Sequence, residues 1–553
     1  MNEQNRWIRR GLASGFLVLF GLTACADLDV VNQNAPDRER AIASAGDVES
    51  LISGGFSQWW NASHGFGTGW GLPPIIANQT FMWSGWPANF GMVQYSSFPR
   101  MAITNIATDQ FYGNMVGYAW STLYRGASAI AVGFQSLDDP EVAAELGEAR
   151  VRRLRAYGKF VQGLIYGSLS MLYDEAFIVD EATDLSATPE AVGYQEVLAA
   201  SAGYFQEAIT LANQGGFDPI PSVWMTVSVT PAELARLAHS MRARYRANVA
   251  RDPAERAAVD WSAVIADVDA GVQDAWYMQT DYFGASVSVS HYTAAYMSQP
   301  SIGWAQVSYF VFGMADQSGM YQDWLSKPPG DRMPQFADGR PRLIITPDKR
   351  FPQGATEAEQ VANPSITHAL TPSPYMTIGH KDWRQPGRGT YRWSYYRSTH
   401  MDFHRTQGTA TATPEITPTE MRMLKAEGLI RQGNADGAAA LINVSRTAAG
   451  LNATDAQGTN TSCVPKLPNG QCGNLLEMMK WEKRMETNVW GVHTVSWFFD
   501  GRGWGDLYAG TATTFPVPCQ DLELLLQECS TFGGAPGERG SAAVSTYQYP
   551  FEG

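Results

Sequence analysis

The sequence predicts a mainly α-helical protein of stacked helical hairpins, with long irregular loops between them. Apolar residues recur every three or four positions from Val151 to Leu172, with Arg and Lys between them, which places them on one face of a helix. Thr-Pro-x-Glu stands at 230–233 and 417–420, where Thr can cap a helix, Pro can occupy its first position and Glu its third. Residues 188–190 (Thr-Pro-Glu) are a partial version of this start signal.

Residues 1–24 have the organisation of a lipoprotein signal peptide. Three arginines precede an apolar run at 11–22, and the sequence Leu22-Thr23-Ala24-Cys25 follows. The run is too short for a membrane-spanning helix, which needs about 20 apolar residues. The four-residue motif resembles the bacterial lipobox, in which the cysteine carries the acyl chains, so Cys25 is the expected lipidation site. An ordinary cleaved signal is the alternative.

Residues 25–40 are expected to form an acylated tether. They are polar, contain Asn and Pro, and show no helical period, which is typical of a linker. Asp27 and Asp29 resemble the acidic signal that sends some lipoproteins to the cell surface. We therefore expect an outer-membrane protein that is lipid-anchored at the cell surface.

Helical pairs are predicted around 118–174, 190–250 and 417–448. The last pair is the most distinct, because the stripe of Met421, Leu424 and Gly428 is followed by Gly433, a residue suited to a left-handed helix end. A second stripe then runs from Ala438 to Gly450. We find no fixed-period repeat consensus in these pairs.

Helical periodicity fails between 276 and 416, where Gly, Pro, Ser and aromatic residues predominate. An irregular segment of this length inside a compact protein usually carries function. We therefore expect this variable, loop-rich segment to contribute to the ligand face.

The remaining cysteines and the charge agree with export. Four cysteines lie near the C-terminus, and we expect the local disulfides Cys463–Cys472 and Cys519–Cys529. A metal site is the weaker alternative, because no C-x2-C spacing is present. The net charge of −14 disfavours a nucleic-acid partner.

No catalytic motif is recognisable. G-x-S-x-G, H-E-x-x-H and Walker sequences are absent. His400 and His404 are four residues apart, but the Arg, Thr and Gly around them favour a solvated loop over a helical metal site. The carboxylate pairs Asp180/Glu181 and Asp274/Asp281 cannot be assigned as acid and base from sequence. We therefore expect a protein that is not an enzyme and uses no cofactor or metal.

Several blocks, in order along the chain, resemble the SusD/RagB family of nutrient-binding outer-membrane lipoproteins. Residues 147–157 (GEARVRRLRAY) resemble the family's A-E-A-R-F-L-R-A-F/Y stretch, and residues 425–434 (KAEGLIRQGN) resemble its R-A-E-A-x2-R-x-G-[ND] helix. The other similar blocks are 28–30 with 48–56, 120–127, 442–446, 482–486, 497–507 and 515–518. Residues 281–416 match no family pattern.

The resemblance implies that residues 41–553 form a SusD/RagB-like domain with tetratricopeptide-like helical pairs as its scaffold. It implies a partner, a SusC-like TonB-dependent transporter, and a ligand, an oligosaccharide or, in some branches, a peptide. The leading hypothesis is capture of an oligosaccharide and its delivery to the transporter. The alternatives are a peptide or other nutrient receptor on the same scaffold, a surface glycoside hydrolase, and a structural surface protein.

Aromatic residues are concentrated in two stretches, 59–90 and 276–324. A sugar has an apolar C–H face and a ring of hydroxyls, so its site pairs flat aromatic rings with polar side chains. The candidate ligand-binding residues are Trp83, Trp86, Asn89, Tyr292, Tyr296, Trp304 and Trp324. The alternative places most of these rings in the core or at the transporter interface.

Overall fold

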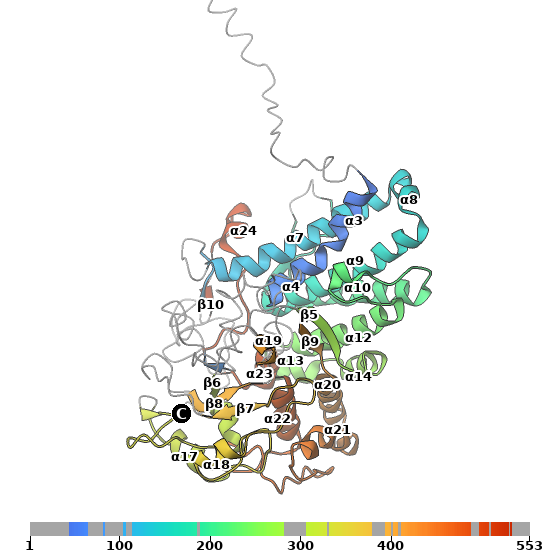
Figure 1. The fold of residues 1–553 in the computed structure, drawn as a ribbon. Coiled ribbons are helices and arrows are strands. Elements are labelled where there is room, and N and C mark those ends of the chain that lie inside the picture. The colour runs from blue at the N-terminus through green and yellow to red at the C-terminus, as the bar shows by residue number, and fades with distance from the viewer. Residues whose placement is uncertain are drawn as a thin grey trace, which may run out of the picture.

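The computed structural model is mainly helical, as predicted, and is drawn in Figure 1. The residues that it describes are 44–64, 81–82, 103–106, 113–184, 189–280, 306–328, 331–378, 393–399, 402–406, 411–487, 497–507, 510–529 and 531–532.

The larger part of the molecule is a stack of helices in which each packs against the next. Its first five members are α7 (Gly113–Leu137), α9 (Glu148–Leu172), α10 (Tyr194–Gln214), α12 (Pro231–Asn248) and α14 (Trp261–Ala270). The short helices α3 (Ala45–Ser53) and α4 (Gly55–His64) pack across α7 and α9. The predicted helix at 151–172 is confirmed as part of α9.

The stack continues far along the chain, because α14 packs against α20 (Pro418–Arg431). Helix α20 in turn packs against α21 (Ala435–Ala448) and α22 (Leu475–Thr487). The predicted hairpin at 417–448 is confirmed, with Gly433 and Gly450 at positive φ angles of 78° and 79°. The long segment 276–416 is thus inserted between two neighbouring helices of the stack.

The predicted helix starts have three different outcomes. Thr230 and Glu233 form the full capping box at the start of α12. Thr417 caps α20, but the side chain of Glu420 binds Arg244 at 2.6 Å. The start signal at 188–190 is wrong. Strand β4 (Ala191–Gly193) pairs with β3 (Glu175–Phe177), and α10 begins only at Tyr194. Thr188 itself lies outside the described residues.

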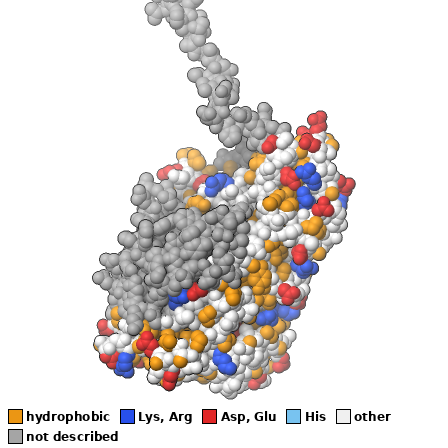
Figure 2. Space-filling model, viewed as in Figure 1, with side chains coloured by type: hydrophobic (Ala, Val, Ile, Leu, Met, Phe, Trp, Pro, Cys, Tyr) orange, Lys and Arg blue, Asp and Glu red, His pale blue; other side chains and the backbone are white. Residues whose placement is uncertain are grey.

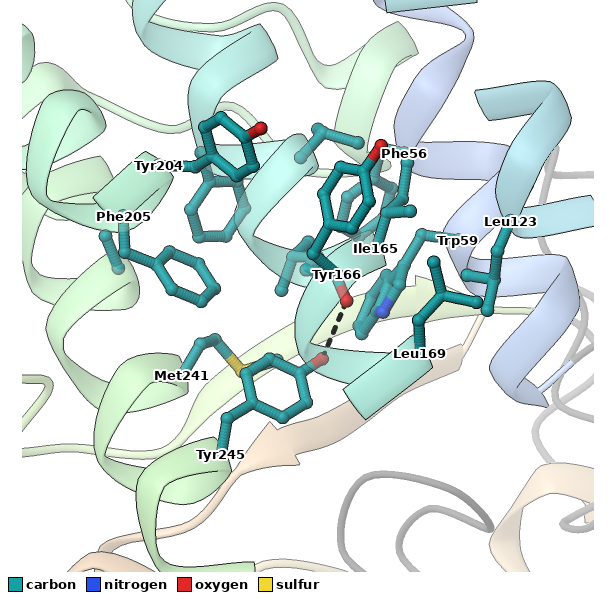
Figure 3. Close-up of a cluster of buried hydrophobic side chains, with 14 of the residues drawn as sticks. Phe56, Trp59, Leu123, Ile165, Tyr166, Leu169, Tyr204, Phe205, Met241 and Tyr245 are labelled. Carbon is teal, nitrogen blue, oxygen red and sulfur yellow. Dashed lines mark hydrogen bonds between the residues drawn. The ribbon is translucent and has the colours of Figure 1, made fainter. Parts of the chain in front are cut away.

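Helix α9 is the centre of the largest hydrophobic core, part of which is shown in Figure 3. Its glycines allow close approach of the neighbouring helices. A Cβ atom at Gly163 would lie 2.7 Å from the ring of Phe205 on α10, and one at Gly167 would lie 2.4 Å from the ring of Tyr245 on α12. The aromatic rings therefore pack directly against the α9 backbone, which makes small residues necessary at these positions.

The inserted segment leaves and rejoins the stack through two paired strands. Strand β5 (Trp276–Thr280) is antiparallel to β9 (Thr411–Ile416), with Trp276 opposite Ile416 and Thr280 opposite Thr411. Beyond this pair, β6 (Gln306–Ser308) and β8 (Trp393–Ser398) form the middle of a four-stranded sheet in the order β1-β6-β8-β7. The segment therefore has more regular structure than its sequence predicts.

A second hydrophobic core fills this part of the molecule and extends to Trp481 and Met485 on α22. Both sequence-local disulfides, Cys463–Cys472 and Cys519–Cys529, are present. The remaining elements are α8 (Pro140–Leu146), α11 (Ser222–Met225), α13 (Pro253–Ala258), α16 (Tyr309–Phe312), η3 (Gly313–Ala315), α17 (Met320–Leu325), α18 (Glu357–Ala362), α19 (Phe403–Thr406), α23 (Trp497–Trp504), α24 (Cys519–Leu524), β1 (Phe81–Met82), β2 (Ile103–Thr104), β3 (Glu175–Phe177), β4 (Ala191–Gly193), β7 (Met376–Ile378) and β10 (Thr531–Phe532).

The described helices carry no apolar stretch long enough to cross a bilayer. On the face drawn in Figure 2, acidic and basic side chains are interspersed over the helical stack rather than gathered by sign. This face offers no basic stripe of the kind that tracks a nucleic-acid backbone.

Candidate ligand site

The two aromatic-rich stretches join the described structure at neighbouring positions. Met82, the residue before Trp83, is paired with Gln306, which stands two residues after Trp304. Residues paired in an antiparallel sheet have Cα atoms about 4.5–5.5 Å apart. The sheet therefore brings together the attachment points of stretches that are more than 200 residues apart in sequence.

Most of the predicted site residues fall in those stretches. Trp83, Trp86, Asn89, Tyr292, Tyr296 and Trp304 lie outside the described residues, as does the expected lipidation site Cys25.

Trp324 is described, and its placement differs from the prediction. Its side chain is 0% exposed and belongs to the second core. The ring lies edge-on to Tyr309 and Phe310, with centroid distances of 5.0 and 4.9 Å, and the Arg332 guanidinium lies 5.4 Å from it. Assignment of Trp324 as a ligand-binding residue is therefore wrong, because packing contacts within the segment enclose it.

A strip of buried polar side chains lies on β9, beside the point where β5 ends. Thr411, Thr413 and Glu415 alternate along the strand and so share one face. The Thr413 hydroxyl lies 2.7 Å from the Thr280 hydroxyl and 2.7 Å from Nε2 of His404. His404 is buried in the one-turn helix α19 rather than solvated as predicted; His400 lies outside the described residues.

The strip continues into a buried ionic cluster. Arg244 donates to both carboxylate oxygens of Glu420, at 2.6 and 2.8 Å, and to the Glu415 carboxylate at 3.0 Å. His64, the last residue of α4, lies 3.2 Å from the other Glu415 oxygen and stacks on Trp60 with a centroid distance of 4.0 Å. The cluster thus fastens α4, in which the first aromatic stretch begins, to β9.

The charges in this cluster stabilise one another. Burial by itself would raise the pKa of Glu415, but His64 and Arg244 outweigh it and lower this pKa below its ordinary value. Burial would likewise lower the pKa of Arg244, but Glu420 and Glu415 raise it. The side chains of the strip and cluster are at most 1% exposed. They therefore form a buried polar floor that joins β9 to the end of α4 and to the end of β5.

This floor is absent from the sequence prediction. The alternation of Thr411, Thr413 and Glu415 in T-A-T-P-E-I is a signal for it, because period-two polarity is typical of one face of a strand. The partners Arg244 and His64 lie more than 150 residues upstream, and no local pattern connects them to β9.

The carboxylates considered for catalysis make structural contacts. Asp180 accepts a hydrogen bond from the Tyr204 hydroxyl at 2.8 Å, and Glu181 pairs with Lys159 at 2.6 Å. Asp274 is exposed, and Asp281 lies outside the described residues. Among the described residues, one group of three side chains of metal-ligand type has its ligand atoms close together, namely Cys519, Glu523 and Cys529. Since these two sulfurs are bonded to each other, neither is a thiolate that could bind an ion.

Comparison with known proteins gives matches at the level of structure. No protein-family model matches the sequence, and no curated protein matches it. A SusD superfamily protein from Bacteroides vulgatus ATCC 8482 aligns over 87% of this chain and 90% of its own, with a TM-score of 0.50 and 12% identity. A SusD-like carbohydrate binding protein from Bacteroides fragilis NCTC 9343 aligns over 92% of this chain and 97% of its own, with a TM-score of 0.50 and 12% identity.

Both alignments cover nearly the whole of each chain, so the likeness includes the helical stack and the inserted segment together. It confirms the fold that the sequence blocks imply, and this chain has the fold of the SusD superfamily.

Proposed function

We propose that this chain is a SusD/RagB-family lipoprotein that binds an oligosaccharide without altering it chemically. It is anchored through Cys25 at the outer-membrane surface and passes its ligand to a SusC-like TonB-dependent transporter. The ligand site is formed by the two aromatic-rich stretches.

The pairing of Met82 with Gln306 is the observation that carries this proposal. It fixes the start of the stretch with Trp83, Trp86 and Asn89 beside the end of the stretch with Trp304. Two aromatic groups that leave the fold from adjacent strands start close enough together to serve one ligand. Stacking rings and amide groups together match the apolar face and hydroxyls of a sugar.

The first test is binding of purified protein to a panel of plant, host and microbial oligosaccharides, with a peptide library in parallel. Against the best oligosaccharide, Trp83→Ala and Trp86→Ala should each weaken binding about tenfold or more, because each removes a large apolar platform. Their melting temperatures should stay close to that of the wild type. Calorimetric titration and thermal unfolding measure the two effects.

Trp324→Ala is the matched control, because this tryptophan lies in the core. It should lower the melting temperature and leave the affinity of the folded protein unchanged. The reverse pattern, in which Trp83→Ala and Trp86→Ala destabilise the protein without changing affinity, contradicts the proposed site. Binding to peptides and to no oligosaccharide assigns the chain to the peptide-receptor alternative.

The remaining parts of the proposal have separate tests. The wild type should incorporate labelled palmitate, and Cys25→Ala should not. A SusC-like transporter from the same cells should co-purify with this chain from detergent-solubilised membranes. Release of reducing ends from a polysaccharide by purified protein would favour the hydrolase alternative.

A further inference from the structure

Among the described residues, the two most exposed large apolar side chains lie in one short loop formed by the end of α24 and the turn that follows it. Leu524 is 83% exposed and Leu526 is 96% exposed. Contiguous exposed leucines are uncommon on a protein that keeps its surface in water, and they mark an interaction site.

The loop is built to present these leucines. Leu522 is buried in the largest core and Leu525 packs against it, so Leu524 and Leu526 face outward between anchored neighbours. The Gln527 amide donates to the Leu522 carbonyl at 2.8 Å, and the Cys519–Cys529 disulfide closes the loop. Leu526 has a φ of 57°, a left-handed conformation that an apolar L-residue rarely adopts.

The loop lies at the end of the molecule where the described chain begins. In Figure 1, α24 and α3 both lie in the upper part of the molecule, and α3 packs against α7. Burial raises the pKa of Asp521 on α24, and Trp120 on α7 opposes burial by lowering this pKa. Ser44, the first described residue, follows Cys25 by 19 residues, which reach at most about 65 Å when extended. A bilayer that holds acylated Cys25 is therefore within reach of this end.

We propose that Leu524 and Leu526 insert into the interfacial region of the lipid bilayer and orient the anchored protein on it. This inference rests on the lipid anchor of the proposed function. Two leucines on one turn are far smaller than the roughly 800 Å² per partner of a stable protein interface. They suit a second, weak membrane contact that acts together with an acyl chain.

Charge determines which lipids the loop prefers. Glu523 and Glu528 are exposed beside the leucines, and the chain carries a net charge of −14. Anionic headgroups repel these carboxylates, and the repulsion is screened by salt. Binding should therefore favour zwitterionic vesicles over anionic ones.

The test is flotation, with phosphatidylcholine vesicles, of the chain from Ala26 onward carrying one chemically attached myristoyl group at its N-terminus, which by itself gives only marginal binding. Removing residues 1–25 leaves every described residue in place. The wild type should float with these vesicles, and the double variant Leu524→Ser/Leu526→Asn should bind at least tenfold less. Asn suits position 526 because it tolerates the left-handed conformation. An unchanged melting temperature and disulfide content show that the variant is folded.

The matched control is Val223→Ser/Val361→Ser, which removes two side chains that are 80% and 67% exposed elsewhere. This variant should float like the wild type. The proposal is overturned if the wild type does not float, if the leucine variant floats equally well, or if anionic vesicles bind more protein. It is also overturned if the leucine variant keeps its vesicle binding and loses only its co-purification with the transporter, which would identify a protein contact. Because the acyl chain is attached chemically and no glycan is present, these outcomes are independent of palmitate labelling and oligosaccharide binding.

Discussion

Replacement of Arg256 by Met should destabilise the fold by about 3–5 kcal/mol, the usual cost of breaking a buried ion pair. Arg256 donates to the two carboxylate oxygens of Glu427 at 3.0 and 2.7 Å and to Asp500 at 3.0 Å. All three side chains are essentially inaccessible to solvent. Methionine keeps much of the aliphatic length but leaves two buried carboxylates with less positive charge.

The pKa of Glu427 gives an independent magnitude. Burial by itself would raise this pKa, but the Arg256 guanidinium outweighs burial and lowers it from 4.5 to about 2. This shift corresponds to roughly 3 kcal/mol. Since the folded-state pKa is depressed, the contribution is present above pH 4.5 and is lost as the pH falls toward 2. Lys483, 2.7 Å from Asp500, remains in the variant and places the expected loss at the lower end of the range.

The assay is urea unfolding at neutral pH, with the free energy extrapolated to water. Arg340→Met is the matched control, because Arg340 and its partner Asp338 are 73% and 52% exposed, and it should leave the unfolding midpoint unchanged. The double variant Arg256→Met/Glu427→Met should be more stable than Arg256→Met alone, because it removes an uncompensated charge. The reasoning is refuted if Arg256→Met costs less than about 1 kcal/mol, within the range of exposed pairs.

Two further changes test the helical stack and one buried carboxyl. Gly167→Ala should destabilise the protein by about 1–3 kcal/mol, because the new Cβ meets the Tyr245 ring at 2.4 Å. The control is Gly203→Ala on α10, where a Cβ meets nothing within 4 Å, and it should be neutral or slightly stabilising. Thermal unfolding measures both effects. Burial raises the pKa of Asp174 from 3.8 to about 6, against the opposing effect of Arg251, so the wild type should lose stability as the pH rises through 6. The variant Asp174→Asn should therefore be about 1–3 kcal/mol more stable than the wild type at pH 7.5 and equally stable at pH 4. Equal unfolding midpoints of variant and wild type at both pH values would contradict this.

Local sequence patterns predicted those elements whose signals are local. The apolar spacing from Val151 to Leu172 and the Thr230 capping box are formed by residues within a few positions of one another, and both are present. The start signal at 188–190 failed because a tertiary contact overrides it. Phe177 pairs with Ala191 across β3 and β4, and this pairing delays the helix until Tyr194.

Distant contacts explain what was missed at the candidate site. An aromatic residue in a Gly- and Pro-rich segment has the same local signature whether it faces a ligand or a core. Trp324 is enclosed by α16 and α17, and His404 is buried by its contact with Thr413 on β9. The placement of neither residue follows from its immediate neighbours in sequence.

The sequence blocks that resemble the SusD/RagB family meet at a buried cluster of charges rather than at the candidate site. Glu427, from the block at 425–434, accepts hydrogen bonds from Arg256 and from Trp504. Trp504 and Asp500 belong to the block at 497–507, and Asp500 binds Lys483 of the block at 482–486.

Changing one member of such a cluster leaves its partners buried and uncompensated, so the identities of these residues depend on one another. The stretches at 83–89 and 292–304 lie outside the described residues, and the described strands next to them are β1 and β6, which do not belong to this cluster. The blocks that resemble the family therefore contain residues that hold the fold together. Variants of residues outside these blocks are the ones whose ligand binding should be measured.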